Sequence, residues 1–278
     1  MTATSPKILR NLASVCRNPA ILGDYFGWLA SSALSGGKPS RRLFGNIAIG
    51  GFSNFSEYHS VVRFIDEPER RFFESFAADG VILDVGANIG VVSLFLARRF
   101  PERVIHAFEP NPTTFEALEA NVARNGGKNI VCHRSAVSET VGTVMFNNDP
   151  VDRGTASISI SNGGGAFAQE VPATTLDAFV VEHGIDKVSL LKIDVEGYET
   201  LVFRGAQRLL NEIQPAMIYF EVCPPLTERA GFAATEPAQM LADAGYALHR
   251  LADDGGLIPV VPDDMAGLEY ENWLAVRR

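Results

Sequence analysis

The sequence predicts an α/β fold in which a doubly wound, mostly parallel sheet carries helices on both faces. From residue 81 onward, short apolar segments of strand length alternate with segments of helical periodicity. Some of the apolar segments end in acidic residues or glycine, as the buried strands of parallel sheets do. Strand–helix–strand units of this length close with right-handed crossovers, so their helices cover both faces.

The expected elements follow in order. In the first half, residues 81–83, 103–108 and 129–133 are strands, and residues 91–99 and 113–124 are helices. In the second half, residues 175–182, 198–210 and 237–244 are helices, and residues 188–193, 216–220, 247–251 and 272–276 are strands. The last two strands predict a sheet that ends in an antiparallel pair.

Two regions stand outside this alternation. Residues 1–79 are expected to form an N-terminal extension with two helices divided at Asn18-Pro19, short strands or a lid at 43–64, and a helix opened by Glu67-Pro68. Residues 80–278 form the main domain. Within it, residues 137–173 are expected to insert a β-hairpin with strands at 143–146 and 157–160 and a glycine loop at 163–165.

Composition argues against some classes of partner. A net charge of −9 gives no general attraction to nucleic acid. The cysteines Cys16, Cys132 and Cys223 form no paired motif, which fits a reducing compartment. No stretch reaches the roughly 20 apolar residues that cross a bilayer, and the N-terminus lacks the apolar core of a signal peptide. We therefore expect a cytoplasmic protein without a nucleic-acid substrate.

One apolar and aromatic segment, residues 20–34, has two interpretations. It could lie on a membrane surface as a peripheral contact, or it could pack against the main domain, which is the commoner arrangement for such a helix. The sequence also leaves open whether the protein forms a homo-oligomer.

The first chemical motif lies between a strand and a helix and reads Asp84-Val85-Gly86-Ala87-Asn88-Ile89-Gly90. Glycines at such a turn let the backbone approach a ligand closely. A dinucleotide fingerprint would need glycine at positions 88 and 91, where this chain has Asn88 and Val91. An adenosine ligand without a pyrophosphate fits better, with Asp84 suited to a cationic amino group. A tight turn that binds nothing is the alternative.

The second motif, Phe108-Glu109-Pro110-Asn111, ends the next strand. A carboxylate in this position can accept hydrogen bonds from both ribose hydroxyls of a nucleoside. Alternatively, Glu109 could interact with the dipole of the following helix. The first interpretation is favoured because ligands gather at the carboxyl ends of parallel strands.

The third motif is rich in charge and reads Leu191-Lys192-Ile193-Asp194-Val195-Glu196-Gly197-Tyr198-Glu199. A lysine in a buried strand has to meet a carboxylate, and Asp84, Asp194 and Glu221 are the candidates. We expect Lys192 to be structural first. The carboxylates could be solvated or cap the next helix, but their number at a strand end favours a functional site, which Glu221 would join.

Together these motifs resemble the FkbM-type methyltransferases, a branch of the class I S-adenosylmethionine-dependent methyltransferases. The similarity covers roughly residues 80–224 and includes Ala136-Val137, Thr174-Thr175-Leu176-Asp177 and Phe220-Glu221-Val222. It implies a Rossmann-like sheet of seven strands. It further implies methylation of a hydroxyl on a sugar, glycan or hydroxylated natural product, with S-adenosylmethionine as the cofactor.

The resemblance also implies roles for individual residues. The methionine part of the cofactor would lie against the glycine turn, the ribose at Glu109, the adenine beside Ser135 and Ala136, and the sulfonium near Asp194. The expected cofactor-binding set is Asp84, Gly86, Ala87, Asn88, Gly90, Glu109, Pro110, Ser135, Ala136 and Asp194.

Methyl transfer to an alcohol requires alignment of the reacting atoms and removal of the hydroxyl proton. Asp194, Glu196 and Glu221 could act as the base, or they could hold a divalent cation such as Mg²⁺ that acidifies the acceptor. The sequence does not decide between these, and no metal ligands are assigned. His59, in an aromatic segment, is a further candidate base.

Two other functions stay open at this point. The fold could bind a nucleoside without chemistry, against which the acidic residues at 194–199 argue. An NAD-dependent oxidoreductase is disfavoured by Asn88 and Val91. The segments 43–64 and 137–173 are expected to form the acceptor pocket.

Overall fold

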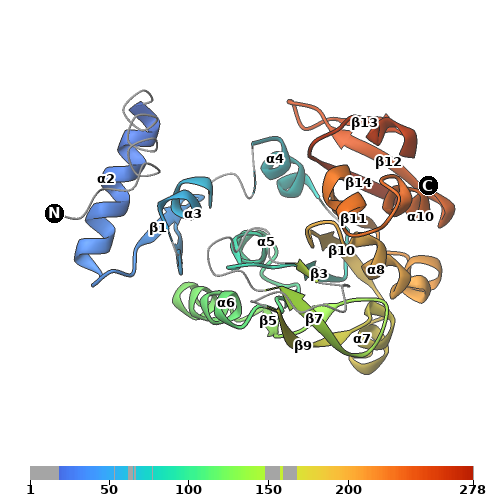
Figure 1. Ribbon diagram of the computed structural model, residues 1–278, viewed down its shortest axis with the longest axis horizontal. Coiled ribbons are helices and arrows are strands. Elements are labelled where there is room, and N and C mark those ends of the chain that lie inside the picture. Colours follow the sequence, from blue (N-terminus) through green and yellow to red (C-terminus); the bar gives the residue numbers. More distant parts are fainter. Residues whose placement is uncertain are drawn as a thin grey trace.

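A computed structural model describes residues 19–52, 54–61, 65, 67–76, 78–147, 157–158 and 168–277 (Figure 1). Its main element is an eight-stranded sheet with the strand order β13-β12-β14-β11-β10-β3-β4-β5. The strands are β3 Val81–Val85, β4 Ile105–Phe108, β5 Ile130–His133, β10 Val188–Ile193, β11 Met217–Val222, β12 Tyr246–Leu251, β13 Leu257–Val260 and β14 Glu271–Arg277. The five strands from β11 to β5 are mutually parallel. The fold is therefore α/β with a mostly parallel, Rossmann-like sheet, as predicted.

The expected number of seven strands is wrong by one. The additional strand, β13, pairs antiparallel with β12 at the edge of the sheet. A turn closed by hydrogen bonds between Ala252 and both Gly255 and Gly256 returns the chain along β12. β13 contains Pro259, which an edge strand tolerates. The final pair is antiparallel as predicted, with β14 inserted between β12 and β11.

Helices cover both faces of the sheet, which confirms the doubly wound arrangement. Alternate residues of one strand enter opposite cores, so that Ile82 packs beneath one helical layer and Leu83 beneath the other. The first layer consists of α4 Glu67–Ser75, α5 Val91–Arg99 and α6 Pro112–Asn125. The second layer contains α7 Leu176–Glu182, α8 Glu199–Arg204 and α10 Glu236–Asp243.

Three helical details differ from expectation. One continuous helix was expected at residues 198–210. Instead, α8 ends at Arg204, and a separate π-helical turn, η3 Leu209–Ile213, follows. Gly205 lies so close to another loop that a Cβ there would be 2.1 Å from the Ser138 carbonyl oxygen. The helices α3 Phe55–Ser60 and α9 Pro224–Arg229 were not predicted, because six residues are too few to show helical periodicity.

The described part of the N-terminal extension consists of α2 Pro19–Leu34, β1 Ser40–Leu43, β2 Ile47–Gly50, α3 and α4. β2 lies on α6, where the Asn121 and Asn125 side chains exchange hydrogen bonds with the backbones of Gly50 and Ala48. α2 lies against β1 and α3 at one side of the molecule (Figure 1). The helix expected before Pro19 falls outside the described residues. Of the helices described, none has the length and apolar character to span a bilayer.

The region 137–173 forms part of a second sheet with the strand order β6-β9-β7-β8. Its strands are β6 Ala136–Val137, β7 Gly142–Asn147, β8 Ser157–Ile158 and β9 Ala168–Thr174. The expected pairing of β7 with β8 is present, but β7 pairs over most of its length with β9, which was not predicted. The expected glycine loop at 163–165 lies outside the described residues.

Candidate active site

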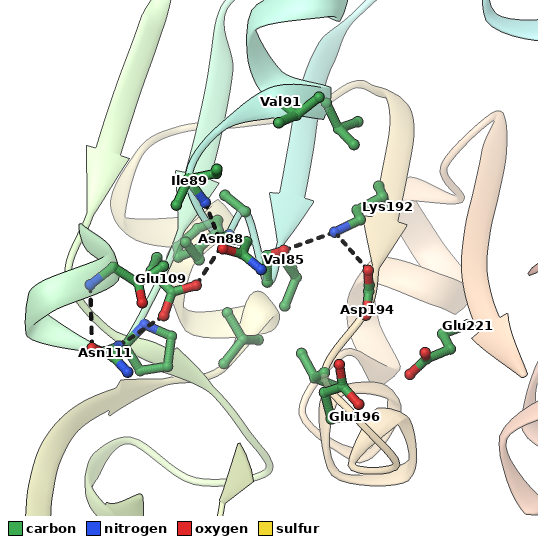
Figure 2. Close-up of a pocket in the computed structure, with 18 of the residues that line it drawn as sticks. Val85, Asn88, Ile89, Val91, Glu109, Asn111, Lys192, Asp194, Glu196 and Glu221 are labelled. Carbon is green, nitrogen blue, oxygen red and sulfur yellow. Dashed lines mark hydrogen bonds and ion pairs between the residues drawn. The ribbon is translucent and has the colours of Figure 1, made fainter. Parts of the chain in front are cut away.

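A cavity of about 320 Å³ opens at the carboxyl ends of β3, β4, β10 and β11. In Figure 2, Glu109 and Asn111 lie at one end of it and Asp194, Glu196 and Glu221 at the other. The structure brings ten of the predicted site residues to its wall: Gly86, Ala87, Asn88, Glu109, Pro110, Ser135, Ala136, Asp194, Glu196 and Glu221.

The turn after β3 is fixed by a close contact with the loop after β10. Gly86 has a φ of 76°, and a Cβ on it would lie 1.8 Å from the backbone oxygen of Asp194. Glycine is therefore required here for its conformation and for the space. Asn88 also has a positive φ, of 50°, and its side-chain oxygen accepts a hydrogen bond from the Ile89 N–H.

Glu109 is buried beneath this turn and ties two loops together. Its Oε2 accepts from the backbone N–H of Asn88 at 3.0 Å, and its Oε1 accepts from that of Asn111 at 2.8 Å. Burial raises the pKa of Glu109 to about 7, although the Asn111 and Asn88 N–H groups lower it. Each carboxylate oxygen still has acceptor capacity for a second donor.

Lys192 is buried in β10, and the prediction that it meets carboxylates is confirmed. Its Nζ lies 3.3 Å from Asp84 Oδ1 and 3.5 Å from Asp194 Oδ2, and it donates to the Gly86 carbonyl at 2.8 Å. Burial alone would lower the pKa of Lys192, but the two carboxylates raise it above its usual value. The second oxygen of Asp84 accepts from Ser93 Oγ.

At the other end of the cavity, three carboxylates converge. One oxygen each of Asp194, Glu196 and Glu221 lies within 4.8 Å of the other two. Within the part of the chain that the structure describes, no group donates a hydrogen bond to the buried Oε2 of Glu221. Burial, and after it the charge of Asp194, raises the pKa of Glu221 well above its ordinary range.

The loop that carries Glu196 is held in an unusual conformation. Glu196 has a φ of 58°, and Gly197 follows with a φ of 94°. A Cβ on Gly197 would lie 2.5 Å from the backbone of Leu226 in α9. The buried Glu199 carboxylate accepts from the N–H groups of Val195 at 3.1 Å and Gly197 at 3.4 Å. Glu199 thus supports the loop.

Three predicted site residues do not line this cavity. Asp84 faces Lys192 and Ser93 in the interior. Gly90 begins α5, where a Cβ would meet Leu118 of α6 at 2.5 Å, so its contact is with the helical layer. His59 Nδ1 lies 2.7 Å from Asp24 Oδ2 within the N-terminal extension.

Sequence reasoning missed another set of wall residues, which are Glu57, Ser60, Phe73, Asn111, Thr114, Tyr219, Tyr270 and Asn272. Glu69 joins two of these, since its Oε1 accepts from Tyr219 and from Asn272 Nδ2. Burial raises the pKa of Tyr219 and of Tyr270, so both phenols stay neutral. Asn111 was within the second motif, but Tyr270 and Asn272 carry no sequence signal, because the insertion of β14 brings them to the cavity.

The family of the methyltransferase FkbM domain matches residues 84–248, more than half of the 278 residues. This range contains the three motifs and the carboxyl ends of all four cavity strands. The chain therefore belongs to the FkbM methyltransferase domain family.

Two relatives and one solved structure illustrate the similarity. The chain is 34% identical over 157 residues to the 31-O-demethyl-FK506 methyltransferase FkbM of Streptomyces tacrolimicus, covering 46% of this chain and 59% of that protein. It is 29% identical over 145 residues to the hexuronic acid methyltransferase AglP of Haloferax volcanii, covering 52% and 57%. The chain thus spans less than two thirds of either relative. An O-methyltransferase family protein from Burkholderia thailandensis superposes with a TM-score of 0.43 at 12% identity, over 80% of this chain and 58% of that one.

Proposed function

We propose that this protein is an S-adenosylmethionine-dependent O-methyltransferase whose acceptor is a hydroxyl group of a sugar or another hydroxylated small molecule. The observation that carries the proposal is the cavity itself. It has a glycine turn and a buried carboxylate at one end and an acidic cluster at the other, all at the carboxyl ends of adjacent parallel strands.

The chain offers suitable groups for each part of this cofactor. Glu109 has acceptor capacity left on both oxygens, which suits the two ribose hydroxyls. The small residues Ser135 and Ala136 would border the adenine, and the turn at Gly86–Asn88 the methionine part. When bound, S-adenosylmethionine supplies the methyl group to be transferred. A dinucleotide-binding turn would have glycine at position 88, where this chain has Asn88, and this fits a ligand without a pyrophosphate.

Asp194 is the residue that we propose as the general base. It lies at the end of β10, its side chain is 42% exposed, and Lys192 is near one of its oxygens. An accessible carboxylate can accept the proton of an acceptor hydroxyl as that oxygen attacks. Lys192 would hold Asp194 in orientation. We do not propose His59 as the base, because its side chain contacts Asp24 and does not line the cavity.

The remaining wall favours an acceptor rich in hydroxyl groups. Tyr219, Tyr270 and Asn272 supply neutral polar groups and aromatic faces beside the acidic cluster. The names of the two relatives, which are a demethyl-FK506 methyltransferase and a hexuronic acid methyltransferase, support an oxygenated small molecule or a sugar as acceptor. Glu57 and Ser60 of the N-terminal extension and Phe146 of the second sheet extend this wall, which supports both segments as parts of the acceptor pocket.

Methyl transfer from labelled S-adenosylmethionine to a panel of hydroxylated sugars and lipophilic alcohols tests this function. We expect labelled product with at least one acceptor and its loss in the Asp194→Asn variant. Glu119→Gln, an exposed position on α6, is the matched control and should retain the wild-type rate. Cofactor binding with no transfer to any acceptor would instead support a binding module. Turnover of a nicotinamide cofactor would support an oxidoreductase.

A further inference from the structure

Three carboxylates converge at the acidic end of the cavity. Asp194, Glu196 and Glu221 place one oxygen each within 4.8 Å of the other two, around a common space in Figure 2. Lys192 approaches Asp194 at 3.5 Å, but it also contacts Asp84 at 3.3 Å and the Gly86 carbonyl at 2.8 Å. Lys192 is therefore shared among three oxygen atoms.

A second observation points to a missing partner. The Glu221 side chain is 6% exposed, and its Oε2 receives no hydrogen bond from the residues that the structure describes. An ionised carboxylate that is buried in this way is unfavourable unless a cation or donor meets it. The Glu221 carboxyl is part of the cluster with Asp194 and Glu196, so one ion there would be within reach of all three side chains.

The local backbone is arranged to hold these ligands in place. Asp194 and Glu221 follow or end two adjacent buried strands, and Gly86 packs against the Asp194 carbonyl. Glu196 lies on a loop fixed by Glu199 and by the contact of Gly197 with α9. A cluster of ligands on such rigid supports needs little reorganisation to bind an ion.

The chemistry of the three ligands selects the type of ion. All are carboxylate oxygens, and the nearby Cys223 thiol donates to the Glu269 carbonyl instead. Hard oxygen ligands favour Mg²⁺, Mn²⁺ or Ca²⁺ over Zn²⁺ or copper. Three carboxylates leave coordination positions for water and for oxygens of a second molecule.

We propose that Asp194, Glu196 and Glu221 form a binding site for one divalent cation of the Mg²⁺ type at the acceptor end of the cavity. This inference extends the proposed function, because a cation here would bind an acceptor hydroxyl and make its proton easier to remove. Cation binding itself, however, depends on neither the cofactor nor the acceptor.

The test is a titration of Mn²⁺ into the full, chelator-treated chain, with free Mn²⁺ followed by electron paramagnetic resonance. We expect one bound Mn²⁺ per chain that Mg²⁺ displaces. In Glu221→Gln the affinity for Mn²⁺ should fall at least about 10-fold. Loss of a residue that only hydrogen-bonds to a metal ligand already lowers metal affinity by about this factor. Glu196→Gln, at a half-buried position, is the second variant, and Glu119→Gln is the control with the same change of charge.

Thermal unfolding gives an independent readout. Mg²⁺ should raise the melting temperature of the wild type but not that of Glu221→Gln. In chelator, Glu221→Gln should be about as stable as the wild type, because the amide keeps the size of the side chain at a position where the carboxyl has an oxygen without a partner among the described residues. The proposed site would be overturned if the wild type bound no Mn²⁺. It would also be overturned if Glu221→Gln and Glu196→Gln bound Mn²⁺ as tightly as the wild type does. Neither result would contradict the proposed function, which is tested separately by cofactor binding and by methyl transfer.

Discussion

The backbone oxygen of Asp194 lies 1.8 Å from the position that a Cβ on Gly86 would occupy. The turn after β3 and the loop after β10 are therefore in direct backbone contact, with the Asp194 N–H also donating to the Val85 carbonyl at 3.1 Å. The two ends of the cavity are positioned relative to each other by this contact. Because no side chain fits at Gly86, the turn cannot change without moving Asp194.

Gly86→Ala should consequently destabilise the protein and weaken binding of S-adenosylhomocysteine. The left-handed φ and the clash with backbone atoms together cost roughly 1–3 kcal/mol. Thermal unfolding and calorimetric titration measure the two effects. Gly23→Ala is the matched control, since a Cβ there meets nothing within 4 Å in α2. It should leave affinity unchanged and add up to about 1 kcal/mol of stability. If Gly86→Ala and Gly23→Ala had the same stability and the same affinity for S-adenosylhomocysteine, the close contact at Gly86 would be contradicted.

Lys192→Met should be strongly destabilising. It leaves the fully buried Asp84 carboxylate without its cation, and breaking a buried ion pair in this way costs about 3–5 kcal/mol. Denaturant unfolding measures the loss. The double variant Asp84→Asn/Lys192→Met should recover much of it, because the uncompensated charge is gone. A single variant as stable as the wild type would show that the ion pair is not needed for folding.

Affinity for S-adenosylhomocysteine should depend on pH through Glu109. Burial raises the pKa of this carboxyl to about 7, so it is protonated in acid and loses acceptor capacity. Affinity should rise from pH 6 to pH 8 and level off above that, with a change approaching tenfold per pH unit below the pKa. Glu109→Gln should bind more weakly at pH 8 with a flat profile. A wild-type affinity independent of pH would contradict the assignment of the ribose to Glu109.

Two buried histidines should contribute less to stability in mild acid than at neutral pH. His106 Nδ1 and His133 Nε2 lie 3.0 Å apart among aromatic rings, and burial first of all lowers the pKa of both to about 4. The unfolded chain, with pKa values near 6.5, binds more protons than the folded chain between these limits. The contribution of these two histidines to the free energy of unfolding should therefore be constant above about pH 7 and fall from pH 6.5 towards pH 4.

Denaturant unfolding across that pH range measures this effect, and His106→Phe should reduce the slope. The substitution keeps an aromatic ring beside Phe179 while removing a group that titrates. A slope that is the same in variant and wild type would assign the acid sensitivity to other groups.

Local sequence patterns were sufficient to predict the elements that build the core of the fold. The helix at residues 91–99 was predicted with the bounds of α5, and the strand ends at Glu109 and Asp194 were predicted to meet at one edge. Lys192 was predictable because a buried cation needs a carboxylate wherever the chain places it.

Features that depend on distant parts of the chain were not predictable. Tyr270 and Asn272 reach the cavity only because β14 inserts between β12 and β11. Gly90 was assigned to the cofactor from its motif, yet its close neighbour is Leu118 on α6. A glycine pattern does not distinguish close approach to a ligand from close approach to a helix.

Calorimetric titration of S-adenosylhomocysteine into the full chain, compared with NAD, tests the central claim most directly. We predict binding of one S-adenosylhomocysteine per chain, a clear loss of affinity in Glu109→Gln, and no binding of NAD. Binding of NAD without binding of S-adenosylhomocysteine would contradict the account.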